Sequence, residues 1–335
     1  MNPKVSVIIP VYNTEQYLAE CLDSVINQTL REIEIIVIND KSPDDSLQII
    51  NEYQKEDSRI ILIDKKINEG VGKARNDGIE KATGEFVIFM DSDDFYSGDS
   101  VLEKLYAAAK EHNVKAAGGR LQKQETDGTL TVQDNPNIID GLSFSQDGLM
   151  KYSDYQYDYG YTCYMFERRL LKDNGVCFPA YSRFQDPPFF VKAMYYAEEL
   201  FYINEPVYCY RLVPSNAKTT IIKTLDFLKG VSDNLNFSRH HNLPKLHRLS
   251  AYRLNTEGSY MSIHNLYQES NDKMLYHLIH ANSMVDTDWL KENGYDLPEP
   301  FVLDVFKYAV DTAKKYESLR NKKIFKLIRG IKRNG

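Results

Sequence analysis

Cysteines, long apolar runs and excess basic charge are all scarce in this sequence of 335 residues. The four cysteines lie far apart and form no CxxC pair, which argues against a zinc site and against a disulfide scaffold. No window approaches the roughly 20 apolar residues of a membrane span, and the apolar start of "MNPKVSVIIP" is too short for a signal-peptide core. We therefore expect reduced thiols and a cytoplasmic protein.

Basic residues are outnumbered, with 41 Lys and Arg against 48 Asp and Glu and a net charge of -7. Such a balance gives no general field for nucleic acid, so we expect no nucleic-acid partner. Positive charge gathers only in the C-terminal "SLRNKKIFKLIRGIKRNG", whose apolar spacing predicts a basic amphipathic helix. That helix is compatible with peripheral binding to the inner face of the plasma membrane. Packing on its own domain or on a second subunit of a homo-oligomer stays open.

Strand-like and helical segments alternate over the first 115 residues. Continuous apolar strands predict a mostly parallel sheet with helices on both faces, an α/β fold in which ligands bind beyond the carboxyl ends of the strands. Thr14 is the expected N-cap of the first helix. The predicted strands are residues 4–10, 32–40, 59–64 and 85–91, and the predicted helices are 14–29, 42–56, 68–84 and 99–112.

The pattern changes after residue 115. Residues 115–215 predict further strands of the same sheet and one helix after Pro188, whereas the spacing from about 220 onward is helical. We expect a catalytic domain over residues 1–218 and a helical C-terminal region over 219–335. Six tyrosines lie between residues 152 and 164; they could line an acceptor cleft, although ordinary packing is the simpler expectation for most of them.

The segment "FVIFMDSDDF" ends a buried strand on Asp91, Asp93 and Asp94. Two carboxylates about 5 Å apart repel by roughly 3 kcal/mol at an effective dielectric near 20, so something must offset this cost. A divalent cation with open positions for phosphate oxygens would do so. The alternative is that these residues form an N-cap and a solvated loop before the next helix.

Other strand ends carry suitable groups. Tyr12, directly after a turn at Pro10, could stack on a base or simply pack at the rim. Asp40 could accept a base N–H or a ribose hydroxyl, or cap the helix that follows Pro43. Gly70 lets the backbone approach a ligand, and Arg75 can reach a phosphate.

Together these segments resemble the family 2 nucleotide-sugar glycosyltransferases with the GT-A fold. The resemblance covers residues 4–125 well and 155–215 more loosely. It implies inverting transfer of a sugar from a UDP-sugar to a hydroxyl of a glycan or lipid-linked acceptor, with Mn²⁺ or Mg²⁺, in bacterial surface-polysaccharide synthesis. The motifs that carry it are "VSVIIPVYNTEQYLAECLDSVINQT", "EIIVINDKSPDDS", "NEGVGKARNDGIEKATGEFVIFMDSDD" and "FQDPPFFVKAMYYAEELFYINEPVYCYR".

The resemblance also implies roles for individual residues. Asp94 matches an acidic position of lesser importance, and a simple cap stays open for it. Arg211 in "YCYRL" can approach the diphosphate or serve as an ordinary loop residue. The remaining donor-site assignments are Pro10, Val11 and Tyr12 lining the uracil pocket, Asp40 holding the base, Gly70, Arg75 and Ser92 beside the nucleotide, Asp91 on the ribose side and Asp93 as the metal ligand.

Downstream, the family usually has Glu-Asp before an aromatic-rich helix, and the Asp acts as general base. This chain has Gln185 and Asp186, so the base is retained as Asp186 and the neighbouring charge is lost. Asp186 also stands before Pro187, where it would be a helix N-cap, and both roles can hold together. Two alternatives stay open: a catalytically impaired family member that binds UDP-sugar or glycan as a scaffold subunit, and a sugar nucleotidyltransferase.

Overall fold

The alternating segments of the first 115 residues form the predicted strands and helices. The structure is a computed structural model, and it describes residues 3–132, 146–213, 220–258, 261 and 272–296. The basic segment at the C-terminus, including its predicted membrane-surface helix, lies outside these residues. The chain divides into two compact units, Met1–Ala217 and Lys218–Gly335, and each is described by itself.

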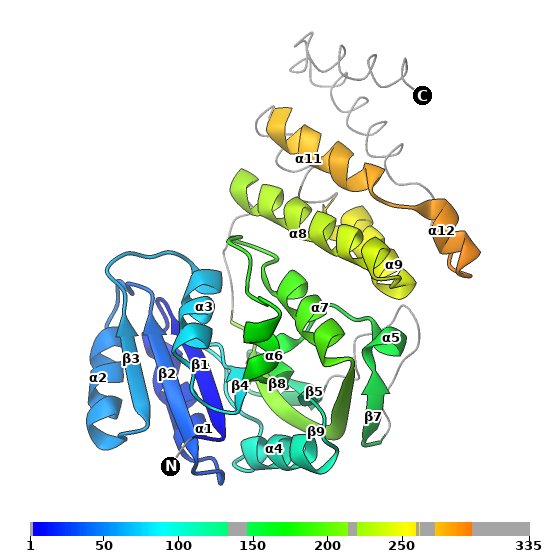
Figure 1. Ribbon diagram of the computed structural model, residues 1–335. Helices are drawn as coiled ribbons and strands as arrows, with labels where there is room; N and C mark the ends of the chain where they lie inside the picture. Colours follow the sequence, from blue (N-terminus) through cyan, green and yellow to red (C-terminus); the bar gives the residue numbers. More distant parts are fainter. Residues whose placement is uncertain (1–2, 133–145, 214–219, 259–260, 262–271, 297–335) are drawn as a thin grey trace. The chain divides into compact units, whose positions relative to one another are not determined.

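The first unit contains one nine-stranded mixed sheet (Figure 1). Its strand order is β3-β2-β1-β4-β8-β5-β9-β7, with β6 paired to β5. Its strands are β1 (Val5–Val11), β2 (Ile33–Asn39), β3 (Ile60–Asp64), β4 (Phe86–Phe89), β5 (Ala116–Gln124), β6 (Leu130–Val132), β7 (Gly148–Lys151), β8 (Tyr164–Glu167) and β9 (Glu199–Arg211).

The predicted parallel arrangement applies to the first half of the sheet. Strands β3, β2, β1 and β4 are parallel, whereas β8 runs antiparallel to both β4 and β5. Because β1 and β2 are buried at every position, both faces of this half are covered. Pro10 does not form the expected turn: it continues β1 opposite Ile38. Strand β4 pairs with β1 only up to Ile8, so the missing N–H of Pro10 interrupts no pairing with β4.

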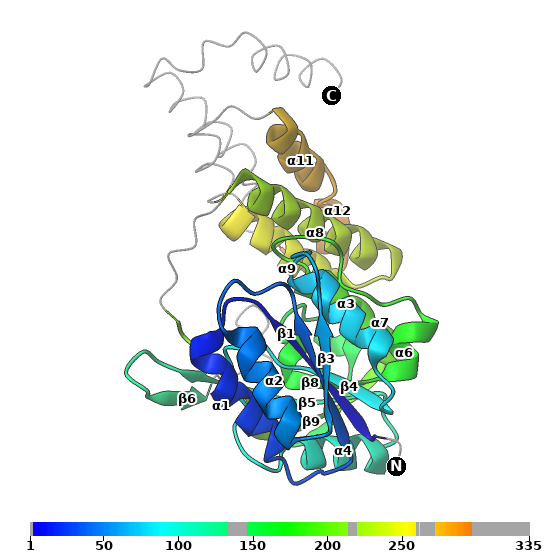
Figure 2. The same ribbon diagram turned by 90° about the vertical axis from the view of Figure 1, so that its left-hand side faces the viewer.

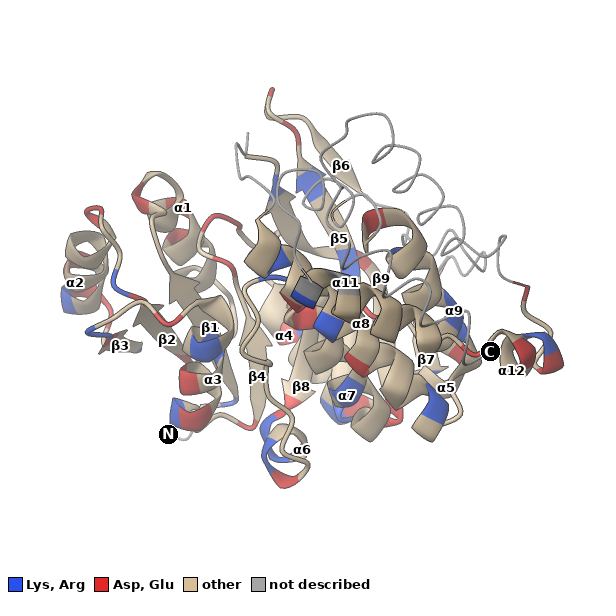
Figure 3. Ribbon diagram, turned by 90° about the horizontal axis from the view of Figure 1, so that it is seen from above, with Lys and Arg blue, Asp and Glu red and all other residues tan. Residues whose placement is uncertain are grey.

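Helices cover both faces of the parallel half. Figures 2 and 3 show α1 and α2 on one side of the strands and α3, α6 and α7 on the other. Helix α1 carries only acidic charged side chains and α3 mixes both signs, so these two helices form no basic face (Figure 3). The helices of this unit are α1 (Glu15–Ile26), α2 (Ser46–Glu56), α3 (Val71–Lys81), α4 (Val101–Glu111), α5 (Tyr152–Tyr155), α6 (Arg168–Asp173), α7 (Asp186–Ala197) and the 3₁₀ turn η1 (Tyr161–Cys163).

Two glycines set the position of α3. Gly70 precedes the helix with φ of +90°, a backbone conformation that a side chain disfavours. Gly78 faces the sheet, where a Cβ would stand 2.4 Å from the Ile8 side chain and 3.2 Å from that of Ile38. The missing side chain at Gly78 therefore allows α3 to lie close to β1 and β2.

Gly78→Ala should lower the free energy of unfolding by about 1–3 kcal/mol, because the overlap with Ile8 outweighs the better helix propensity of alanine. Urea unfolding followed by circular dichroism measures this. Gly98→Ala is the control, since a Cβ there meets nothing within 4 Å. Equal stability of the two variants would contradict the close packing.

The second unit is helical in its described residues, as predicted. Its elements are α8 (Ile221–His240), α9 (Pro244–Arg253), the π-helical turn η2 (Leu254–Gly258), α11 (Asp272–Ser283) and α12 (Thr287–Glu292). None of the described helices of either unit combines the length and the apolar character that a membrane crossing requires.

A buried histidine joins three segments of this unit. His247 Nε2 accepts the backbone N–H of Asp286 at 3.0 Å, so Nδ1 carries the proton and donates to Ser238 Oγ at 2.8 Å. The ring is fully buried and packs edge-on against Trp289. Burial lowers the pKa of His247 from 6.5 to about 4.

Acid should therefore destabilise this unit between pH 6.5 and about 4. In that window the unfolded chain binds a proton at His247 that the folded chain does not. The free energy of unfolding therefore decreases as the pH is lowered, by about 3 kcal/mol in total. The single tryptophan, Trp289, reports urea unfolding by fluorescence. His247→Asn should remove this pH dependence, and the control His280→Asn, at an exposed position, should keep it. An unchanged pH dependence in His247→Asn would count against this assignment.

Candidate functional site

The acidic loop after β4 is held in place by β9. Tyr208 accepts the backbone N–H of Asp91 at 3.1 Å and donates its own proton to Asp94 at 2.6 Å. Arg211 donates its backbone N–H to the other Asp94 oxygen at 2.8 Å and its Nε–H to the Asp93 carbonyl at 3.0 Å. Phe95 also forms a bridge with Cys209. A strand more than a hundred residues away thus fixes the conformation of this loop.

The interpretation of Asp94 as a simple cap is wrong. Helix α4 begins after Ser100, while the Asp94 side chain is buried against β9. Burial, and then the charges of Asp91 and Asp93, raise the pKa of Asp94 to about 8, although the Tyr208 hydrogen bond acts in the opposite direction. Asp94 is therefore a structural connection between the loop and β9.

Asp91 lies in a second polar cluster. Its carboxylate pairs with Arg75 at 2.6 Å and accepts from the Tyr161 hydroxyl at 3.1 and 3.2 Å. The Arg75 guanidinium lies over the rings of Tyr161 and Phe178, and its Nε and Nη1 have no hydrogen-bond partner within the described residues. Burial lowers the pKa of Arg75, but the charges of Asp91 and Asp186 outweigh it and raise the pKa. Two buried guanidinium nitrogens of Arg75 thus lack an acceptor among the described residues.

Asp93 differs from its two neighbours. No other residue in the described part of the chain donates a hydrogen bond to its carboxylate. Burial and the charge of Asp91 raise the pKa of Asp93. A half-buried carboxylate with unused lone pairs is a donor that suits a hard divalent cation. No group of three or more His, Cys, Asp or Glu side chains in the described ranges is arranged to hold an ion, so a ligand would have to supply further oxygens.

Asp186 is the first residue of α7, and Gln185 rather than Asp186 is the N-cap residue. Burial raises the pKa of Asp186, and the charge of Arg75 opposes this. Asn76, next to Arg75 on α3, exchanges two hydrogen bonds of 2.9 Å with the backbone of Phe178. Helix α3 therefore holds the segment that leads into α7, and this places Asp186 on the side of the site where Arg75 lies.

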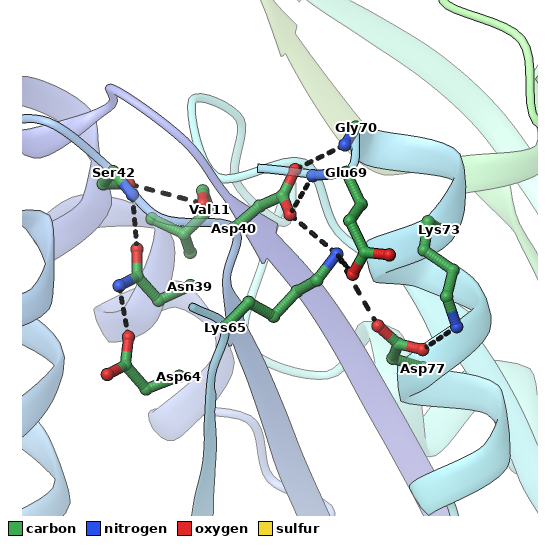
Figure 4. Close-up of polar contacts among 10 residues, drawn as sticks. All are labelled: Val11, Asn39, Asp40, Ser42, Asp64, Lys65, Glu69, Gly70, Lys73 and Asp77. Atoms are coloured by element: carbon green, nitrogen blue, oxygen red, sulfur yellow. Dashed lines mark hydrogen bonds and ion pairs between the residues drawn. The ribbon is translucent and has the colours of Figure 1, made fainter. Parts of the chain in front are cut away.

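Asp40 directly follows β2 and does not cap the helix that follows Pro43; it binds the loop that precedes α3 instead (Figure 4). Its oxygens accept the backbone N–H groups of Glu69 and Gly70 at 3.0 and 2.8 Å, at the start of α3 rather than after Pro43. Lys65 pairs with it at 2.7 Å. The backbone of Gly70 is thus engaged by Asp40.

The residues after β1 are placed as follows. Pro10 and Val11 are buried in β1, and the Val11 carbonyl accepts the backbone N–H of Asp40. The Tyr12 side chain is 51% exposed, so another aromatic ring can stack on it. Thr14 occupies the N-cap position of α1, but its hydroxyl makes no capping bond and donates to Ser92 at 2.9 Å. Asp44 accepts the N–H of Glu15 there instead.

Arg211 has extensive protein contacts. Its Nη1 donates to Gln124 and its Nη2 pairs with Glu20, both at 2.6 Å, and its guanidinium lies over the rings of Tyr17 and Phe95. An approach of Arg211 to a diphosphate remains a prediction. Most tyrosines of the 152–164 cluster are core residues, as expected, and only Tyr159 is substantially exposed, at 48%.

The comparison with protein families agrees with this geometry. The model of glycosyl transferase family 2 matches residues 6–183, more than half of the chain. The chain belongs to glycosyl transferase family 2.

Two relatives within this family show how far the similarity extends. The uncharacterized glycosyltransferase EpsJ of Bacillus subtilis is 34% identical over 226 residues, which cover 64% of this chain and 63% of EpsJ. The poly(ribitol-phosphate) beta-glucosyltransferase of Bacillus spizizenii is 34% identical over 200 residues, which cover 57% of this chain but 29% of that enzyme. The chain therefore spans less than two thirds of the length of either relative.

Solved structures confirm the GT-A fold expected for a family 2 member. TarS of S. aureus (residues 1–349) in complex with UDP-GlcNAc matches with a TM-score of 0.65 at 23% identity, over 85% of this chain and 82% of TarS. The mannosyltransferase PcManGT of Pyrobaculum calidifontis, in complex with GDP-Man and Mn²⁺, matches with a TM-score of 0.55 at 15% identity, over 95% and 88% of the two chains. At these identities the likeness establishes the fold alone.

Three residues of this family 2 site were not predicted from the sequence. Tyr161 belongs to the cluster expected either to pack in the core or to line an acceptor cleft, and neither expectation includes its hydrogen bonds to Asp91. Tyr208 is one of many tyrosines in the sequence, and Lys65 lies in a charged loop. Strand alternation does not single out Tyr208, because Tyr210 points to the same face of β9. No local pattern marks Lys65 either.

Tyr208→Phe should weaken the acidic loop, because the Asp91 N–H loses its acceptor and the buried Asp94 loses a donor. We expect a loss of about 1–3 kcal/mol in the free energy of unfolding. Urea unfolding measures it, with Tyr159→Phe, at an exposed position, as the control. A variant as stable as the control would show that β9 does not hold the loop through this hydroxyl.

Proposed function

We propose that this chain is an inverting glycosyltransferase that moves a sugar from a UDP-sugar to a hydroxyl of a glycan or lipid-linked acceptor. The observation that carries the proposal is the contrast among the carboxylates at the sheet edge. Asp91 and Asp94 are bound by protein donors, whereas the Asp93 carboxylate has no donor from another residue in the described part of the chain. Asp186 lies at the start of α7, where its charge interacts with that of Arg75. One carboxylate is thus available for a cation and another for a proton.

Asp93 would hold Mn²⁺ or Mg²⁺, with phosphate oxygens of the donor as further ligands. The ion, when bound, neutralises the leaving diphosphate as a Lewis acid. Arg75, which pairs with Asp91 through Nη2 and has two guanidinium nitrogens without an acceptor among the described residues, would bind the nucleotide beside Asp91. The exposed ring of Tyr12 would stack on the base, with Asp40 at its edge.

Asp186 would take the proton of the acceptor hydroxyl as the sugar is transferred. Its raised pKa suits a general base, because the conjugate acid must be stable enough to accept a proton during the reaction. A single carboxylate in this role, with no second one as nucleophile, fits one displacement and therefore inversion. Gln185 is buried and neutral, so it adds no charge beside the base.

The acceptor and the location belong to the same proposal. The name of the Bacillus spizizenii relative points to a poly(ribitol-phosphate) acceptor for that enzyme, and a surface polymer is the acceptor class we propose here. Such an acceptor would be met at the inner face of the plasma membrane, from the cytoplasm. The basic C-terminal segment would supply the approach to the membrane.

Two substitutions separate metal binding from base chemistry. Asp93→Asn should abolish Mn²⁺-dependent binding of UDP in calorimetry. Asp186→Asn should retain UDP binding and lose activity by about 10²–10⁴-fold in a screen of UDP-sugars for hydrolysis and transfer. Since the pKa of Asp186 is raised, activity of the wild type should fall with decreasing pH earlier than for an ordinary aspartate.

Asp99→Asn is the matched control, because this exposed aspartate lies just beyond the acidic loop. If the affinity of the wild type for UDP is the same with and without Mn²⁺, the proposed metal role of Asp93 is wrong. Metal-dependent UDP binding without any sugar transfer would favour the alternative, a scaffold subunit that binds the donor.

A further inference from the structure

Lys65 is a buried cation surrounded by acidic side chains (Figure 4). It follows β3 directly, and its ammonium lies 2.7 Å from Asp40, 3.1 Å from Glu69 and 3.7 Å from Asp77. Its side chain is 6% exposed. Burying an ammonium is costly unless it is paired, so this position is maintained by the carboxylates around it.

The three carboxylates do not share Lys65 equally. The side chain of Asp40 is 4% exposed, whereas those of Asp77 and Glu69 are 23% and 40% exposed and can be solvated by water. Asp77 also pairs with Lys73 at 2.5 Å. Within the described ranges, Lys65 is the one cation that pairs with Asp40, so Asp40 depends on it most.

Asp40 in turn organises the entry to α3. It accepts two backbone N–H groups, one on each oxygen, which leaves its Oδ2 with a further lone pair. Asp40 also lies beside the end of β1, because its own N–H donates to the Val11 carbonyl. Asp40, which follows β2, thus connects β1 through its backbone N–H with Lys65 after β3 and the loop before α3 through its carboxylate, at the edge where the nucleotide is expected.

We infer that Lys65 is a positioning residue of the donor site: by pairing with the buried Asp40 it holds that carboxylate in place at the edge where the base of the nucleotide is expected. This inference rests on the proposed function. Lys65 touches no reacting atom in this scheme and acts only through Asp40. The groups facing Asp40 are Lys65 from the end of β3, Glu69 and the backbone of Gly70 from the loop, and the Val11 carbonyl from β1, with Asp77 and Lys73 of α3 beyond Lys65.

The inference predicts a pH signature. Without Lys65, Asp40 remains buried with no cation, and desolvation then favours its protonated form. A protonated Asp40 loses its charge-assisted bond to a base N–H, so the affinity for UDP should fall as the pH is lowered. With Lys65 present, the ion pair with Asp40 is retained, so no such loss is expected.

The test is calorimetry of UDP binding at pH 8 and pH 6 on the wild type, Lys65→Met and Lys66→Met. The ratio of variant to wild-type affinity cancels the titration of UDP itself. For Lys65→Met this ratio should fall by about tenfold or more from pH 8 to pH 6. Lys66 is the charge-matched control, because it is 90% exposed and pairs only distantly, with Asp64; its ratio should stay near one at both pH values.

Each outcome is informative. If the wild type fails to bind UDP, the proposed function fails, whatever Lys65 does. If the wild type binds and the Lys65→Met ratio is the same at both pH values, Lys65 is merely structural and the inference is overturned. If Lys65→Met does not fold, the double variant Glu69→Gln and Asp77→Asn is the alternative test. It removes the other two carboxylates near Lys65, so that Asp40 is the one that remains of the three. Its UDP affinity should then stay within about threefold of the wild type, and a tenfold loss would overturn the inference.

Discussion

The hydrogen bond from Tyr208 to Asp94 is the contact on which the acidic edge of this protein depends. Asp91, Asp93 and Asp94 follow a buried strand within four positions, so their mutual repulsion must be offset. The protein offsets it unequally: Tyr208 and Arg211 engage Asp94, and Arg75 and Tyr161 engage Asp91. Asp93 is left without a protein donor among the described residues. The division of the cluster into structural and available carboxylates follows from these contacts.

Helix α3 is the second element that assembles the site. Gly70 and Gly78 determine where it starts and how closely it approaches the sheet, and Asp40 holds the loop that precedes it through the backbone N–H of Gly70. The same helix presents Arg75 to Asp91 and Asn76 to the segment before α7. One short helix contacts the ends of two strands and the segment leading to Asp186. A small shift of this helix would therefore displace residues in every part of the candidate site.

Much of the fold could be predicted because the first four strands are continuous apolar runs separated by amphipathic helices. Such runs are buried on both faces whatever their partners, so local pattern is sufficient. The incorrect details involve partners distant in the sequence. The sequence predicts that Thr14 caps its own helix, but its hydroxyl binds Ser92. For Asp94 the sequence leaves a local cap open, but its side chain binds β9. Pattern analysis cannot rank a local partner against one more than seventy residues away.

The sequence by itself determined the family, the order of strands and helices in the parallel half, and the gathering of Tyr12, Asp40 and Asp93 at one edge, because parallel strands align their carboxyl ends. Only the tertiary structure decided which carboxylates are engaged, that Asp40 pairs with the buried Lys65, and that two guanidinium nitrogens of Arg75 lack an acceptor among the described residues. The physical reason is that hydrogen bonding and desolvation depend on neighbours in space. Those neighbours are supplied by β9, by α3 and by the residue after β3, and no local pattern specifies their side-chain contacts.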